Sequence, residues 1–143
     1  MNRRTILLVE DSEDDTELAC YALAKCRVPV NVVALRTGEA ALEYLAQAAE
    51  GVEAKPRPDL VLLDLQLPGI SGLEVLRRMR AKPDIRRTLV VMLTTSDDDQ
   101  DICASYDLGV NSYIRKPVEL GAFSAVLDEL SAYWLETNTR PPQ

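Results

Sequence analysis

Acidic residues, a threonine and a lysine stand at the ends of short apolar runs, and these residue types can do metal and phosphate chemistry. Glu10 and Asp11 end one run, Asp64 ends another, Thr94 ends a third, and Lys116 follows a fourth. Collected at one place, the carboxylates would make a negative pocket that favours a hard cation with oxygen ligands, such as Mg²⁺. Asp64 could then attack phosphorus as a carboxylate nucleophile, with Lys116 supplying positive charge.

Taken singly, these residues also have structural explanations. Glu10, Asp11, Asp14 and Asp15 are acids of the kind that stabilise the start of a helix, and threonine is an ordinary strand residue. Asp64 is harder to explain in this way, because an unpaired charge at the edge of an apolar strand is unfavourable. The chemistry therefore depends on whether the fold brings the residues together.

Five apolar runs, each followed by a helical pattern, would do so. They are Thr5–Glu10, Asn31–Arg36, Leu60–Asp64, Leu89–Thr94 and Ser112–Arg115. Continuously apolar runs are typical of strands that are buried on both faces of a parallel sheet. The alternation predicts a (βα)₅ doubly wound α/β fold, in which ligands bind beyond the carboxyl ends of the strands.

Polar residues mark the ends of the predicted helices. Ser12 with Asp15, and Ser96 with Asp99, have the spacing of a capping box, and Gly109 is suited to end a helix. Two helices carry an apolar stripe that is expected to face the sheet. The stripes are Leu18, Ala22, Leu23 and Cys26 in the first helix and Leu73, Leu76 and Met79 in the third.

The composition fits one domain over residues 1–143 and disfavours several functions. The chain has 143 residues, 47% of them hydrophobic, which is enough for one core. Its 23 acidic and 16 basic residues give a net charge of −7, which disfavours binding to nucleic acid or to an anionic membrane. Because the chain has no histidine, catalysis by Ser-His-Asp or Cys-His groups is excluded. The tail from about residue 138 is expected to fray.

A cytoplasmic protein is expected from the start of the chain and from its cysteines. No signal peptide is recognisable, and no apolar stretch approaches the roughly 20 residues that span a bilayer. The three cysteines, Cys20, Cys26 and Cys103, form no C-x-x-C pair. We expect them to be buried, reduced thiols rather than disulfide or zinc ligands.

Four segments, Leu7–Ser12, Leu62–Gly72, Leu93–Ser96 and Tyr113–Pro117, resemble the receiver domains of the response-regulator family. The Asp-x-x-x-Pro-Gly-x-x-Gly element that begins at Asp64 is among the most particular marks of that family. The resemblance covers essentially the whole chain and implies the flavodoxin-like strand order 2-1-3-4-5. It also implies a response regulator of a two-component phosphorelay.

The resemblance assigns the acceptor and the metal ligands. Asp64 would accept a phosphoryl group from a histidine kinase and form an aspartyl phosphate. Mg²⁺ would be held by the carboxylates of Asp11 and Asp64 and by the backbone carbonyl of Gln66, and Glu10 would complete the metal site by steadying the ion's waters. The protein would catalyse only its own phosphorylation and dephosphorylation and would otherwise not be an enzyme.

The resemblance also assigns the residues that sense the phosphoryl group. Thr94 and Lys116 would bind its oxygens, and a cis peptide bond before Pro117 would aim the lysine into the crevice. Thr94 and the aromatic Tyr113 would form the conformational switch. A half-buried strand tyrosine without a switching role is the alternative for Tyr113.

Two other functions compete with this interpretation. A pseudo-receiver, which is a phosphorylation-independent interaction module, would be expected to have lost one of Asp11, Asp64, Thr94 and Lys116, and all four are present. A phosphatase of the haloacid dehalogenase type needs a second aspartate two residues after Asp64, where this chain has Gln66. No P-loop or dinucleotide-binding motif occurs.

Three features indicate the partners. Residues 105–114, the long loop before the third strand and the segment Tyr133–Leu135 resemble single-domain regulators that work with bacterial phytochrome histidine kinases. The expected partners are thus a sensor kinase, such as a bacteriophytochrome, and a downstream protein or histidine phosphotransfer protein. The chain ends after its fifth helix, so no output domain is expected within it.

A homodimer is also predicted from the last helix. Apolar residues recur there at three- and four-residue steps, and the helix is expected to extend past Leu135 and to overhang the sheet. Leu127, Leu130 and Trp134 would then meet their counterparts in a second copy. In the alternative, this turn folds back on its own domain.

Overall fold

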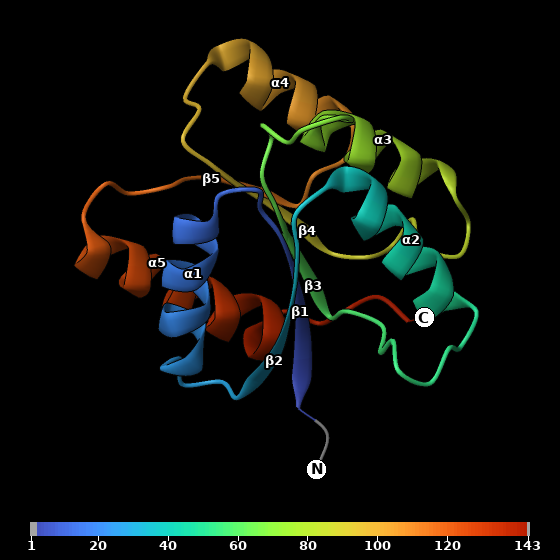
Figure 1. Ribbon diagram of the computed structural model, residues 1–143, viewed down its shortest axis with the longest axis horizontal. Coiled ribbons are helices and arrows are strands. Elements are labelled where there is room, and N and C mark those ends of the chain that lie inside the picture. Colours follow the sequence, from blue (N-terminus) through green and yellow to red (C-terminus); the bar gives the residue numbers. More distant parts are fainter. Residues whose placement is uncertain (1–2, 143) are drawn as a thin grey trace.

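The computed structural model describes residues 3–142 as a parallel sheet between two layers of helices (Figure 1). The strands are β1 (Arg4–Val9), β2 (Val30–Leu35), β3 (Leu60–Leu63), β4 (Val90–Thr94) and β5 (Ser112–Arg115). The helices are α1 (Glu13–Ala24), α2 (Gly38–Ala49), α3 (Gly72–Ala81), α4 (Asp99–Asp107) and α5 (Leu120–Ala132), followed by a π-helical turn, η1 (Tyr133–Thr137). The strand order β2-β1-β3-β4-β5 confirms the predicted topology. Among these residues, no helix has the length and apolar character needed to cross a bilayer.

Each central strand contributes side chains to two separate apolar cores, one on each face of the sheet, which explains its continuously apolar sequence. In β3, Val61 and Leu63 pack with α2 and α3 on one face. Leu60 and Leu62 pack with α1 and α5 on the other face. Successive side chains of a strand point to opposite faces, so a strand that is covered on both sides has no position left for a polar residue. The polar residues are therefore confined to the strand ends.

One of the two predicted helix starts is confirmed, and the other is wrong. Ser12 caps α1, with its Oγ accepting the Asp15 N–H at 3.2 Å. Helix α4 is capped by Asp98 rather than by Ser96, so it begins two residues later than predicted. The Ser96 hydroxyl instead donates to the Asp101 carboxylate at 2.6 Å. Gly109 follows the end of α4 with a φ of 90°, as a C-terminal glycine should.

The apolar stripes are confirmed only in part. Ala22 and Leu23 are buried, but Leu18 is 40% exposed. The buried face of α1 includes Ala19, and Leu18, one residue earlier, points about 100° away from Ala19 around the helix axis. The cysteines are free, as predicted, but they are not all buried: Cys20 and Cys26 are half-buried and Cys103 is exposed. In the third helix, Leu76 and Met79 are buried and Leu73 packs at the core's edge.

The predicted dimer residues on α5 lie in the core of their own domain. Leu127 and Leu130 are buried against α1 and the sheet, so their assignment to a dimer interface is wrong. The chain then changes from α-helix to the π-helical turn η1, where the Asn138 N–H donates to the Tyr133 carbonyl at 2.6 Å. In this wider turn, Leu135 is also buried, and Trp134 packs half-buried on the same core. The turn folds back rather than overhanging the sheet.

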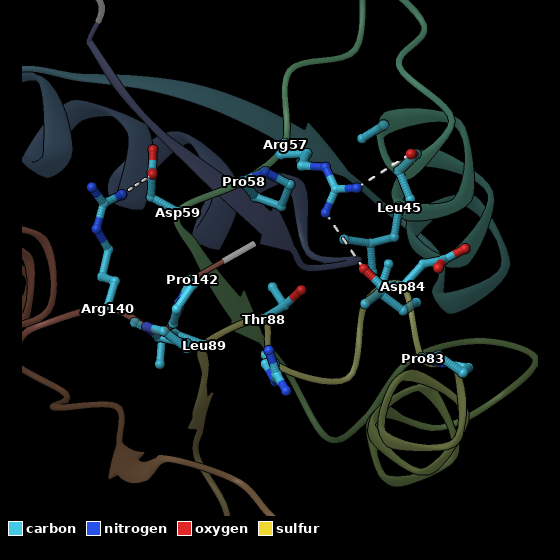
Figure 2. A pocket seen from close by; sticks show the side chains of 15 residues that line it. Leu45, Arg57, Pro58, Asp59, Pro83, Asp84, Thr88, Leu89, Arg140 and Pro142 are labelled. Atoms are coloured by element: carbon cyan, nitrogen blue, oxygen red, sulfur yellow. Dashed lines mark hydrogen bonds and ion pairs between the residues drawn. The ribbon is translucent and has the colours of Figure 1, made fainter.

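The described part of the tail ends at Pro142 and lies against the domain, and fraying from about residue 138 stays a prediction. The tail runs from the α5 side of the sheet to the α2 side (Figure 1). Arg140 forms an ion pair with Asp59, and Pro142 lines a cavity of about 410 Å³ at the ends of α2 and α3 (Figure 2). An ion pair and proline contacts thus connect the tail to Asp59 and to this cavity.

Candidate functional site

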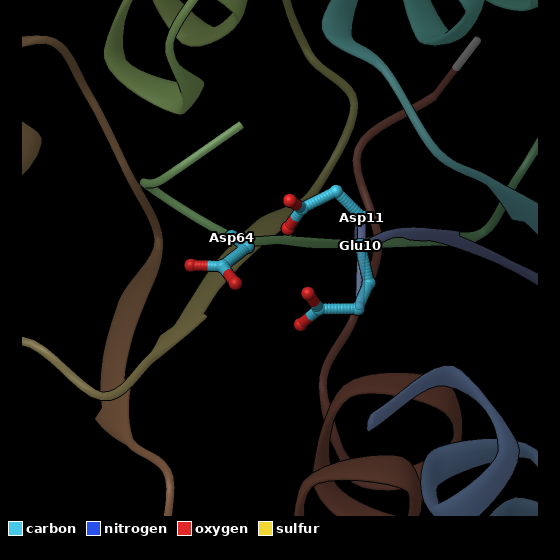
Figure 3. A group of neighbouring side chains, drawn as sticks. All are labelled: Glu10, Asp11 and Asp64. Atoms are coloured by element: carbon cyan, nitrogen blue, oxygen red, sulfur yellow. The ribbon is translucent and has the colours of Figure 1, made fainter. Parts of the chain in front are cut away.

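Three carboxylates converge where β1 and β3 end (Figure 3). Val9 and Leu63 are partners in the parallel pairing of these strands, so the residues that follow them are neighbours. One oxygen from each of Glu10, Asp11 and Asp64 lies within 4.8 Å of the others. Glu10 and Asp64 are buried, whereas Asp11 is exposed at the mouth of the site. The structure therefore brings together three of the predicted metal-site residues.

This donor set fits a hard divalent cation. All three ligands offer carboxylate oxygens, the donors that Mg²⁺ prefers, and the exposed side leaves room for the waters that this ion retains. The Gln66 N–H donates to Asp64 Oδ1 at 3.3 Å, which orders the start of the β3–α3 loop. A ligand role for the Gln66 carbonyl stays a prediction.

Lys116 is the basic centre of the site. Its Nζ donates to Glu10 Oε1, to Asp15 Oδ2 at 3.1 Å and to Asp64 Oδ2 at 3.2 Å. Burial alone would lower the pKa of Lys116, but Glu10, Asp64 and Asp15 together raise it above its ordinary value. The lysine therefore remains an ammonium group and holds a positive charge next to the predicted acceptor.

Glu10 shows how strongly the site disfavours negative charge without a cation. Its burial raises the pKa of its carboxyl to about 7, and the neighbouring Asp64 adds to the rise, although hydrogen bonds from Lys116 and from the Ser12 N–H oppose it. The Ser12 N–H donates to Glu10 Oε2 at 3.0 Å. A bound cation would favour the ionised form of this carboxyl.

The peptide bond before Pro117 is trans, so the predicted cis bond is wrong; the described residues contain no cis bond. Lys116 is aimed instead by the sheet. Its N–H donates to the Thr94 carbonyl at 2.7 Å and so continues the pairing in which Thr94 faces Arg115. This extension of the β4–β5 ladder brings the lysine to the edge where Asp64 lies.

Thr94 and Tyr113, the two predicted switch residues, are connected through Ser96. Thr94 is fully buried, and its Oγ1 accepts the Ser96 N–H at 3.4 Å. The Tyr113 hydroxyl donates to the Ser96 carbonyl at 2.8 Å. Burial raises the pKa of Tyr113, so it stays a hydrogen-bond donor. Sequence reasoning missed this role of Ser96 because it was interpreted as a helix cap.

The glycines of the Asp-x-x-x-Pro-Gly-x-x-Gly element have separate structural reasons. Gly69 has a φ of 75°, which side chains rarely tolerate. Gly72 lies against the backbone of Asp64 and Leu65, and its N–H donates to the Leu65 carbonyl at 2.9 Å. A Cβ at Gly72 would overlap the Asp64 carbonyl. The element thus fixes the backbone that carries the predicted acceptor.

Gly72→Ala should therefore destabilise the fold by about 1–3 kcal/mol, because the added methyl group forces backbone rather than a flexible side chain to move. Urea unfolding measures this effect. Gly121→Ala is the matched control, since its Cβ would meet only the end of the Glu119 side chain in α5. Equal unfolding midpoints for the two variants would contradict the packing argument.

Comparisons with known proteins agree with this fold and give the chain's family. The family model described as the response regulator receiver domain matches residues 6–128. The chain is 42% identical over 138 residues to the response regulator Rcp1 of Synechocystis sp., covering 96% of this chain and 93% of that protein.

Two solved structures of response regulators are similar over nearly their whole length. The phosphorylated cyanobacterial phytochrome response regulator RcpA has a TM-score of 0.89 and 43% identity, with coverage of 99% of this chain and 100% of that one. The Mn²⁺-bound form of Rcp1 has a TM-score of 0.86 and 42% identity, with coverage of 97% and 99%. The chain therefore belongs to the response regulator receiver family.

Proposed function

We propose that this protein accepts a phosphoryl group from a histidine kinase on Asp64, in a Mg²⁺-dependent reaction, and signals by changing conformation. The observation that carries the proposal is the position of Asp64 Oδ2, at 3.2 Å from the Lys116 ammonium and beside two further carboxylates. This contact, at the ligand-binding edge of the sheet, supports Asp64 as the nucleophile and Lys116 as the group that neutralises charge.

The chain's own residues account for most of the chemistry. The Asp64 carboxylate attacks the phosphorus of a phosphohistidine, a P–O bond forms, and the P–N bond breaks to release the donor's imidazole. Lys116 stays protonated and donates to a phosphoryl oxygen. A bound Mg²⁺ supplies the charge neutralisation that lets an anionic donor approach these carboxylates.

A phosphohistidine donor is proposed to contact α1, α5 and the loop after Lys116. Helices α1 and α5 pack against each other, and both carry exposed apolar side chains. Tyr21 of α1 is 57% exposed, Leu120 of α5 is 50% exposed, and Val118 in the loop after Lys116 is fully exposed. Val118 and Leu120 follow Lys116 within four residues, so they are the proposed contacts for a protein donor.

The conformational response is proposed to pass through the loop after β4. When the Thr94 hydroxyl donates to a phosphoryl oxygen, it moves the Ser96 backbone that is bound to it. Tyr113, which donates to the Ser96 carbonyl, then changes its position with the loop. The output would be contact with a downstream protein or phosphoryl transfer to a histidine phosphotransfer protein.

A bacteriophytochrome is the proposed kinase, supported by the similarity to Rcp1 and RcpA, and the cytoplasm is the proposed compartment. The test is to mix the protein with a panel of autophosphorylated histidine kinases that includes bacteriophytochromes. The initial rates of phosphoryl transfer are then ranked. Fastest transfer from a bacteriophytochrome supports the partnership, and preference for an unrelated kinase contradicts it.

A homodimer remains a separate proposal, with a smaller interface than the sequence suggests. Leu127 and Leu130 are unavailable, so the contact would involve Tyr133, which is 49% exposed, and the exposed edge of Trp134. Tyr133→Ser should then lower the particle mass toward that of one chain in sedimentation. An unchanged mass for this variant, or a monomeric wild type, contradicts the contact.

A further inference from the structure

Lys116 has one more partner than the predicted site provides. An ammonium group carries three N–H donors, and here three carboxylates accept them: Glu10, Asp64 and Asp15. The lysine side chain is 8% exposed and that of Asp15 is 41% exposed. Asp15 comes from the first turn of α1 and is not among the metal-ligating carboxylates.

The carboxylate of Asp15 is free for this contact because another group has taken its usual place. In a capping box, the acid three residues after the cap reaches back to the N–H of the cap residue. Here the Ser12 N–H donates instead to Glu10 Oε2 at 3.0 Å. Only half of the capping box forms, through the Asp15 N–H and Ser12 Oγ. The side chain of Asp15 turns away from its own helix and toward Lys116.

We propose that Asp15 is a positioning residue for phosphoryl transfer, which aims the Lys116 ammonium at the Asp64 oxygen that becomes phosphorylated. This inference rests on the function proposed above. When Asp64 becomes an acyl phosphate, Lys116 donates to an oxygen of the new phosphoryl group instead of to the Asp64 carboxylate. Glu10 and Asp15 are then the two fixed partners that keep the third N–H pointed at that oxygen. Asp15 thus acts through the lysine and does not touch the phosphoryl group.

The test measures phosphorylation by acetyl phosphate at saturating Mg²⁺, with intact-protein mass spectrometry as the readout. In this reaction the phosphoryl group passes to Asp64 and acetate leaves. Asp15→Ala should slow the reaction about tenfold, the size expected for a lost charge-assisted hydrogen bond. Asp15→Asn should be intermediate, because the amide oxygen still accepts a hydrogen bond.

Two controls separate positioning from general effects of charge and helix stability. Asp14→Ala removes the same charge from the same exposed first turn of α1 and should change the rate by less than about twofold. In a Lys116→Ala background, Asp15→Ala should cause no further slowing, since a double-mutant cycle reports only the contact between the two residues. These two results together would support the role.

Two outcomes would overturn the inference while leaving the proposed function in place. In the first, Asp15→Ala reacts as fast as Asp14→Ala. In the second, it slows the reaction equally with and without Lys116. A wild-type protein that takes no phosphoryl group from acetyl phosphate or from any kinase would overturn the proposed function itself, and the inference with it.

Discussion

Asp64→Asn should take up no stable phosphoryl group from an autophosphorylated histidine kinase. The amide keeps the shape of the side chain but lacks the anionic oxygen that attacks phosphorus. The fold should survive, because the change also removes one of three crowded negative charges and Lys116 retains Glu10 and Asp15 as partners. Radiolabel transfer measures the reaction, and urea unfolding verifies that the variant is folded.

Asp84→Asn is the matched control for this result. It makes the same chemical change at an exposed residue beside the cavity at the opposite end of the sheet. The control should be labelled at the wild-type rate. If the Asp64 variant is labelled equally fast, Asp64 is not the acceptor. If the wild type and both variants remain unlabelled but bind the same partner equally well, the pseudo-receiver alternative is correct.

Removal of Mg²⁺ by excess chelator should slow phosphoryl transfer about a hundredfold or more, since metal neutralisation contributes several kcal/mol to such reactions. Without the metal ion, the carboxylates of Glu10, Asp11 and Asp64 face an incoming anionic phosphoryl group, and the Lys116 ammonium offsets only part of their charge. The measurement is the initial transfer rate as a function of Mg²⁺ concentration. Equal rates with and without chelator would remove the metal from the mechanism.

Asp11→Ala tests the same point within the protein. It should raise the Mg²⁺ concentration needed for half-maximal rate, because it removes the exposed member of the three-carboxylate cluster. Glu13→Ala is the control, as it removes an equal charge from an exposed residue of α1 that lies outside the cluster. A similar shift for both variants would indicate a general charge effect rather than a ligand.

The strands are predictable from the sequence because a strand that is buried on both faces has apolar residues at successive positions. Strands such as Leu60–Leu63 are apolar at every position, and each of the five predicted runs overlaps a strand to within one residue at either end. The parallel order follows from the family resemblance. The convergence of Glu10, Asp11 and Asp64 follows in turn, since residues after paired strands must be neighbours.

Two of the errors, at Ser96 and Asp15, share a cause, which is that a competing group takes the partner that local spacing suggests. Ser96 was expected to cap α4, but its backbone links Thr94 with Tyr113 and its hydroxyl binds Asp101. The Asp15 side chain is predicted to accept the Ser12 N–H and complete a capping box, but the Glu10 carboxylate accepts that N–H instead. Local spacing identifies possible partners, whereas the choice among them depends on groups that are distant in the sequence.

The sequence by itself determined the strands, their alternation with helices along the chain and the carboxylates that end β1 and β3, because these depend on periodicity and on the apolar runs. Only the tertiary structure decided that Lys116 contacts Asp15, that Arg140 of the tail pairs with Asp59, and that Leu130 faces the core. Each of these depends on a contact between segments far apart in the chain: 101 residues separate Lys116 from Asp15, and 81 separate Arg140 from Asp59. Such contacts form only after the layers have packed, and no local pattern encodes them.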